Sequence, residues 1–273
     1  MFKRLVIALG YLLTAMVTAV SAQEQPCVYP RQDMVSARLR VRTSQSGLRY
    51  DYLYSLENQP SAQQVVISFA VEAFTSDGTP PTQVSPANWE AGGPITESAF
   101  YVWDTFEEPR GLGPGMAASG FTFTQADLPA IVTFLAWGEV EPPTFPGREA
   151  PECENTNIVQ NSFKGKTVGP KPPPKDLVAL DFLNYLITLV HDSRQQGWIT
   201  RDGAKTSLLA KLTNAKRKLE AGDTKVTKNM LKGFLNEVEA TSCQEFDCPG
   251  NKPLTSEAYA LLFFNGQFLW ERL

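Results

Sequence analysis

The chain changes character at residues 163–175, which read FKGKTVGPKPPPK. Three consecutive prolines, Pro172–Pro174, favour a stiff, extended spacer. Prolines, glycines and aromatic residues are common before this stretch, whereas leucine, lysine and alanine dominate after it. Acidic residues prevail before it, and basic residues are concentrated just after it. The change predicts two domains of different class, joined by a Pro-rich linker at residues 164–175.

Short alternating or apolar segments fill the chain before this linker. Residues 37–43 alternate apolar side chains with arginines, and residues 48–56 place their tyrosines on one face. A continuous apolar run at Val65–Phe74 fits a central strand. Many short strands without intervening helices predict an antiparallel β-sandwich over residues 23–163. Further strands are expected at Ala99–Asp104, Ala117–Thr124, Ile131–Gly138 and Phe163–Val168.

Apolar residues recur at helical spacing after the linker. Gly197 and Gly222 suit helix C-caps, because glycine adopts the left-handed conformation without strain. The pattern predicts a small helical bundle over residues 176–273. Helices are expected at Leu177–Val190, at Leu208–Leu219, after a cap at Asp223 or Thr224, and after a cap at Thr255. The predicted fold is therefore an antiparallel β-sandwich followed by a helical bundle, with each half expected to fold independently.

Both halves contain sequence motifs that resemble those of known bacterial modules. In the helical half these are GWITRDG at 197–203, SLLAKL at 207–212, LEAGDT at 219–224 and KNMLKGFLNEV at 228–238. In this order they resemble the FIMAH domain, a small helical module of many secreted bacterial proteins and hydrolases, over Leu177–Leu273. The resemblance implies structural roles for these phrases and carries over no catalytic residue. A cysteine-containing insertion at 243–251 departs from the family pattern.

The front half resembles uncharacterised β-sandwich modules of secreted bacterial proteins over residues 30–170. The phrase GLGPGMAASGFTF at 111–123 carries this resemblance, together with the preceding tyrosine-rich and apolar segments. No activity follows from it.

The amino terminus predicts the compartment. Lys3 and Arg4 precede an apolar run from Leu5 to Val20, and Ala22 ends a short small-residue segment. This pattern predicts a secretory signal peptide at residues 1–22. The alternative is a membrane anchor, but the run is shorter than the roughly 20 residues of a bilayer span. We therefore expect an extracytoplasmic chain, periplasmic or released, with no membrane span after cleavage.

The four cysteines fit an oxidising compartment. Cys27 and Cys153 bracket the predicted sandwich, whereas Cys243 and Cys248 bracket one loop of the helical half. Bracketing within each domain favours the pairs Cys27–Cys153 and Cys243–Cys248 among the three pairings that four cysteines allow. A zinc site is the rival interpretation, and the absence of a nearby histidine or a Cys-x-x-Cys pair disfavours it.

Charge and histidine content exclude several function classes. A net charge of −4 excludes a generally basic nucleic-acid binder. The single histidine, His191, is followed by Asp192 and Ser193, and adjacent residues on a helix point in different directions. Carboxylate pairs such as Glu107–Glu108 lie in acidic loops, and sequence does not give the separation that glycoside hydrolysis requires. We therefore expect no enzymatic activity, no cofactor and no metal.

Two surface features point to binding. Tryptophans at 89, 103 and 137 suit a core, but Trp89 lies in a predicted loop and is the best candidate for stacking on a ligand. Lys225, Lys228 and Lys232 share one helical stripe, expected to face solvent or to dock on the acidic sandwich or an envelope polymer. The predicted function is a secreted, non-enzymatic adhesion, scaffold or accessory protein whose partner is an envelope polymer or another extracytoplasmic protein. The alternatives are a carbohydrate-binding module and a hydrolase.

Overall fold

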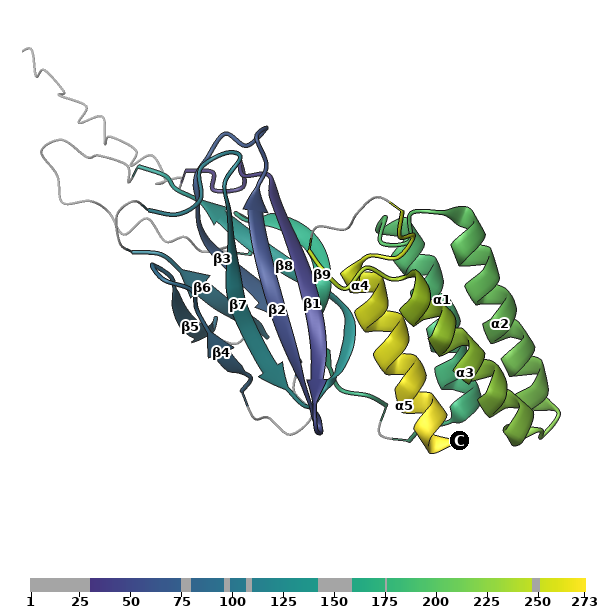
Figure 1. Ribbon diagram of the computed structural model, residues 1–273. Helices are drawn as coiled ribbons and strands as arrows, with labels where there is room; N and C mark the ends of the chain where they lie inside the picture. Colours follow the sequence, from purple (N-terminus) through teal and green to yellow (C-terminus); the bar gives the residue numbers. More distant parts are fainter. Residues whose placement is uncertain are drawn as a thin grey trace, which may run out of the picture.

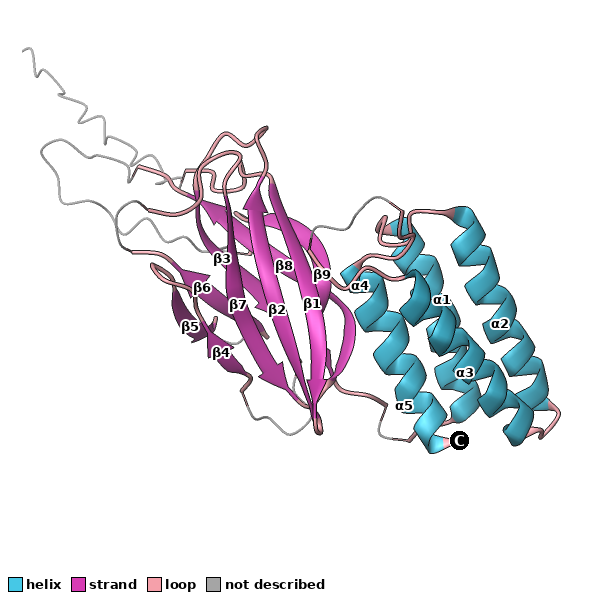
Figure 2. Ribbon diagram, viewed as in Figure 1, coloured by secondary structure: helices cyan, strands magenta, loops and turns pink. Residues whose placement is uncertain are grey.

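The computed structural model describes residues 30–74, 80–95, 99–106, 110–141, 159–174, 176–246 and 251–273. The front half forms two antiparallel sheets and the back half a helical bundle, which confirms the predicted fold class (Figure 1, Figure 2). One sheet has the order β1(Ala37–Ser46)-β2(Arg49–Asn58)-β7(Ala117–Gln125)-β4(Thr82–Val84). The other has the order β5(Glu90–Pro94)-β6(Phe100–Asp104)-β3(Val66–Glu72)-β8(Leu128–Gly138)-β9(Phe163–Lys171).

Aromatic side chains fill the space between the two sheets. The tyrosines of β2 point inward as their alternation predicts, and the hydroxyl of Tyr52 donates to the carbonyl of Asp127 at 2.7 Å. Burial raises the pKa of Tyr52 and of Tyr54 well above the usual value, so both remain protonated hydrogen-bond donors. Trp103 stacks on Phe69 with ring centroids 5.0 Å apart. The hydroxyl of Tyr54 likewise donates to the carbonyl of Val168 at 3.0 Å, so both fully buried tyrosines have an acceptor.

The boundary between the halves differs from the prediction. The strand predicted at Phe163–Val168 is confirmed, but it continues to Lys171 as β9 and takes in residues 164–171 of the predicted linker. β9 pairs with β8 from Phe163 opposite Ala136 to Lys171 opposite Leu128. Residues 167–170 are all buried in this ladder, Thr167 and Val168 among them, so both faces of this part of the strand are covered. The sandwich therefore extends to Lys171, and the prolines Pro172–Pro174 alone form the described spacer. The sequence predicts no strand at the short edge strands β4 and β5, because β4 has only three residues and the glycines and proline of β5 hide the alternation.

The helices are α1(Ala179–Gln195), α2(Asp202–Glu220), α3(Thr224–Thr241) and a continuous rod made of α4(Ser256–Tyr259), the π-helical turn η1(Ala260–Phe264) and α5(Asn265–Arg272). Gly197 and Gly222 adopt φ values of +77° and +76° after α1 and α2, as expected of C-caps. Asp223 caps α3 by accepting a hydrogen bond from the amide of Val226. Thr255 precedes α4 but makes no capping hydrogen bond through its side chain. Of the described helices, none is long and apolar enough to span a bilayer.

The bundle packs against the side of the sandwich where β1 and β9 form the two sheet edges, with α4 and α5 nearest and α2 outermost (Figure 1). The rings of Tyr50 and Phe264 meet edge to face at 5.3 Å. Asn265 Nδ2 donates to the carbonyl of Pro129 at 2.7 Å. One hydrophobic cluster continues from the sandwich into the bundle. This shared core speaks against the prediction that the halves fold independently, because separation would expose apolar surface on both.

Candidate functional site

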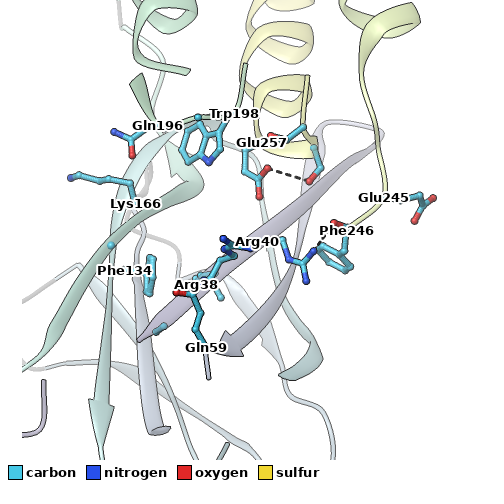
Figure 3. Close-up of a pocket in the computed structure, with 16 residues that line it drawn as sticks. Arg38, Arg40, Gln59, Phe134, Lys166, Gln196, Trp198, Glu245, Phe246 and Glu257 are labelled. Carbon is cyan, nitrogen blue, oxygen red and sulfur yellow. Dashed lines mark hydrogen bonds between the residues drawn. The ribbon is translucent and has the colours of Figure 1, made fainter. Parts of the chain in front are cut away.

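A cleft of about 530 Å³ opens between the sandwich and the bundle (Figure 3). Its floor comes from β1, β8 and β9, and its opposite wall comes from the turn after α1 and the start of α4. The volume lies within the range of roughly 300–1,000 Å³ that is typical of small-molecule sites, which often form at domain junctions. Both domains must be in place for this cavity to exist.

The arginines of β1 supply positive charge to the floor. Leu39 and Val41 point into the core, so the alternating Arg38 and Arg40 point outward. Arg40 is fixed, because its Nη1 donates to the carbonyl of Phe246 at 2.7 Å. The side chain of Arg38 is 57% exposed and lies 3.9 Å from the carboxylate of Glu57. Arg38 is therefore the more available of the two cations.

The turn with the sequence GWI at 197–199 forms the wall of the cleft opposite this floor. The carbonyl of Ser193 accepts from the amide of Trp198 at 2.9 Å, and the carbonyl of Trp198 accepts from the amide of Thr255 at 3.0 Å. The left-handed conformation of Gly197 lets the chain turn back at this point. Ile199 is buried, whereas Trp198 is half-buried and its indole lies beside the cleft (Figure 3). The family resemblance implies a structural role for this motif, and nothing in the sequence indicates that it lines a cavity.

A buried carboxylate ties the two walls together. Glu257 is only 4% exposed, and its Oε1 accepts from the amide of Val41 at 3.2 Å. Because β1 is an edge strand, the outward amide of Val41 has no neighbouring strand to bond. Glu257 therefore satisfies a sheet edge and fixes the start of α4 on the sandwich. The carboxylate also lies 3.5 Å from the hydroxyl of Ser256 (Figure 3).

The insertion that departs from the family pattern also reaches β1. Glu245 pairs with Arg42 at 2.9 Å, and the Arg42 guanidinium lies 5.7 Å from the ring centre of Phe246. The amide of Cys243 donates to the carbonyl of Leu254 at 2.8 Å, which anchors the segment to the bundle. The described part of the insertion thus forms a side wall of the cleft.

Trp89, the predicted stacking residue, lies in the core instead. It is 8% exposed, and its ring meets Phe69 and Phe121 edge to face at 5.8 and 5.1 Å. The left-handed conformation of Asn88 (φ 67°) precedes it, and the amide of Trp89 donates to the carbonyl of Pro86. This turn directs the indole between the sheets, so the face needed for stacking on a ligand is covered. Trp103 and Trp137 are also buried.

The residues around His191 do not converge on a reactive centre. His191 is exposed at the end of α1, whereas Ser193 is fully buried and its carbonyl holds the turn at Trp198. Within the described ranges, no group of three or more His, Cys, Asp or Glu side chains is placed to hold a metal. Glu107 and Glu108 lie outside the described residues.

The lysine stripe of α3 is only partly free. Lys225 and Lys232 are exposed, whereas the ammonium of Lys228 lies 5.0 Å from the ring centre of Trp270. α3 packs on α2, and α2 is the outermost helix, on the far side of the bundle from the sandwich (Figure 1). This placement favours a solvated face over docking on the sandwich.

Three of the four predicted disulfide cysteines, Cys27, Cys153 and Cys248, lie outside the described residues, as does the predicted signal peptide. Cys243, the first residue of the insertion, is buried. The two pairings and the cleavage after Ala22 stay predictions, which non-reducing peptide mapping and amino-terminal sequencing of the mature protein test directly.

The fold and the cleft define a two-domain protein in which a β-sandwich and a small helical bundle share one ligand-sized cavity. Residues 183–263 match the family model of the FIMAH domain, which confirms the resemblance seen in the helical half. No curated protein is significantly similar to the chain in sequence.

Two solved structures are distantly similar to the chain. An uncharacterised protein from Nocardia farcinica with an immunoglobulin-like fold is 11% identical, with a TM-score of 0.29, over 50% of this chain and 98% of that one. A chain of the TssK-TssF-TssG baseplate subcomplex of a type VI secretion system is also 11% identical, with a TM-score of 0.19, over 88% of this chain and 87% of that one. Because both TM-scores lie below 0.5, neither likeness bears on the function of this chain.

Proposed function

We propose that the chain is an extracytoplasmic, non-enzymatic binding protein that acts as an adhesion or accessory protein at the cell envelope. Its ligand enters the cleft between the sandwich and the FIMAH domain. The observation that carries this proposal is the cleft itself, whose walls come from both domains. The charged amino terminus and the apolar run after it support the extracytoplasmic location.

The contacts around the cleft support a preformed site. Glu257 holds the start of α4 on β1, Arg40 holds the insertion, and Asn265 holds the carboxyl-terminal helix on β8. A cavity whose walls are already fixed loses little conformational freedom when a ligand binds, which favours affinity. The exposed position of His191 and the burial of Ser193 support a binding role over hydrolysis.

Co-sedimentation of the mature chain with insoluble envelope material from the source organism tests this function. Trp198→Ala and the milder Gln196→Ala alter the cleft wall and should reduce the retained fraction at least several-fold. Trp270→Ala is the matched control, because Trp270 is also half-buried but contacts Lys228 away from the cleft. Equal retention of all variants, each shown by circular dichroism to be folded, would contradict a role for the cleft.

A panel of chromogenic esters and glycosides tests the non-enzymatic part of the proposal. We expect no turnover by the wild-type chain. Turnover that Trp198→Ala abolishes would show that the cleft is an active site and would overturn this part.

A further inference from the structure

We propose that the cleft binds an acidic saccharide, with Trp198 as the ring on which a sugar stacks and with Arg38 and Lys166 as the groups that hold its carboxylates. The inference rests on the proposed function and names the ligand class of the same site. It replaces Trp89, whose ring is buried, with a tryptophan that faces a cavity.

Trp198 has the geometry that stacking on a ligand requires. Its indole is half-buried at the bundle side of the cleft, and its backbone is fixed by hydrogen bonds to Ser193 and Thr255 (Figure 3). Aromatic rings of this kind offer a large apolar face at little entropic cost, because few bonds rotate. Two other rings line the cleft: Phe134 is 2% exposed and belongs to the core, and the ring of Phe246 already lies 5.7 Å from the guanidinium of Arg42. Stacking in the cleft therefore falls to Trp198.

The charges in the cleft favour an anion. Glu245 is paired with Arg42, and Glu257 is occupied by the amide of Val41. Lys166 is exposed on β9, and its Nζ donates to the neutral hydroxyl of Thr133 at 3.1 Å. Arg38 lies 3.9 Å from the carboxylate of Glu57, which it shares with Arg40. The three cations Arg38, Arg40 and Lys166 outnumber the two carboxylates Glu245 and Glu257, so the lining of the cleft carries a net positive charge, which favours an anion.

The remaining polar side chains suit hydroxyl groups. Gln196 is exposed next to Trp198, and its amide offers both a donor and an acceptor. Gln59 on the sandwich side accepts from the hydroxyl of Ser36 at 3.1 Å, which fixes its amide at the cleft floor. A ring face, two amides and two cations together match a sugar that carries hydroxyls and a carboxylate. A neutral sugar offers the two cations no negative charge, and an acidic peptide such as an oligoglutamate offers no flat apolar face to the half-buried ring of Trp198.

Isothermal titration of the full mature chain with trigalacturonate and with its neutral counterpart, galactotriose, tests the inference. At low salt we expect trigalacturonate to bind at least tenfold more tightly than galactotriose. Arg38→Ala/Lys166→Ala should abolish this difference, whereas Trp198→Ala should weaken both sugars. Arg217→Ala/Lys218→Ala is the charge-matched control, because both residues are exposed on α2, outside the cleft lining, and it should change neither affinity.

Each other outcome overturns the inference in a distinguishable way. Equal affinity for both sugars, or a preference that survives Arg38→Ala/Lys166→Ala, rejects the acidic ligand but leaves the cleft as a binding site. Tri-glutamate binding as tightly as trigalacturonate, with no effect of Trp198→Ala, assigns the cleft to acidic peptides instead. If no sugar binds while Trp198→Ala still loses envelope retention, only the ligand class fails. If retention also survives Trp198→Ala, the proposed function fails with it.

Discussion

Asn265→Ala should destabilise the sandwich and the bundle together. The Asn265 side chain is 1% exposed, and its Nδ2 donates to the carbonyls of Pro129 and Leu261 at 2.7 and 2.8 Å. Pro129 lies opposite Pro170 in the β8–β9 ladder, and proline has no amide hydrogen to donate. The bundle therefore supplies a donor that the neighbouring strand lacks at this position. Alanine removes this donor and leaves the Pro129 carbonyl buried without it.

The size of the effect follows from the buried acceptor. Leaving a buried carbonyl without a donor costs about 1–3 kcal/mol, so we expect a loss of about 2 kcal/mol in the free energy of unfolding. For a chain of this size, that corresponds to a melting temperature lower by roughly 4–8 °C. Far-ultraviolet circular dichroism follows the helices, and near-ultraviolet circular dichroism follows mainly the aromatic core of the sandwich. Both signals should shift by the same amount, because the domains share one core.

Asn236→Ala is the matched control, because Asn236 is exposed on α3. It should change the melting temperature by little. A shift of the helical signal alone in Asn265→Ala would refute the reasoning, since it would show that the bundle melts separately. An unchanged melting temperature would show that water replaces the lost donor.

Three further predictions concern packing and charge. Gly165→Ala should lower the free energy of unfolding by about 1–3 kcal/mol in a urea titration, because the added methyl overlaps the ring of Phe134. Burial, with a smaller effect of Glu90, raises the pKa of Asp104, so the protonated carboxyl stabilises the fold at low pH and this contribution is lost as pH rises through that pKa. Asp104→Asn should therefore raise the melting temperature at pH 7, and the gain should shrink towards pH 3; a gain that does not depend on pH would contradict this. Lys228→Ala should cost about 0.5–1 kcal/mol through its contact with Trp270, and Lys225→Ala should cost less; equal losses would exclude the contact as the cause.

The alternation and helical periodicity of the sequence predict most of the fold. The segment 37–43 becomes part of β1, and Asp223 caps α3 as expected. The edge strands β4 and β5 cannot be predicted in this way, because they are short and lack a clear alternation of apolar and polar residues. Pairing of β4 with β7 and of β5 with β6 holds them in the sheets. The predicted strand Phe163–Val168 forms most of β9, but the overlapping linker prediction is wrong as far as Lys171, since the lysines, glycines and proline of this segment carry little strand propensity.

The cleft could not be predicted from local sequence. The predicted loop around Trp89 implies an accessible ring, yet the left-handed conformation of Asn88 directs this ring into the core. Trp198 belongs to a motif for which the family resemblance implies a structural role. Its position at a cavity depends on β1 and β9, which are distant from it in the sequence. Clefts at domain junctions arise from long-range packing, which periodicity does not encode. The docking of Glu257 on an edge-strand amide has the same origin.

Hydrogen–deuterium exchange of the mature chain, with and without saturating trigalacturonate, tests most directly whether the ligand site lies between the two domains. We predict slower exchange in two separate segments, residues 37–40 of the sandwich and residues 196–198 of the bundle, because both line the same cleft. The turn between α2 and α3 should exchange at an unchanged rate. Protection confined to one domain, or centred on that turn, would contradict a ligand site at the junction.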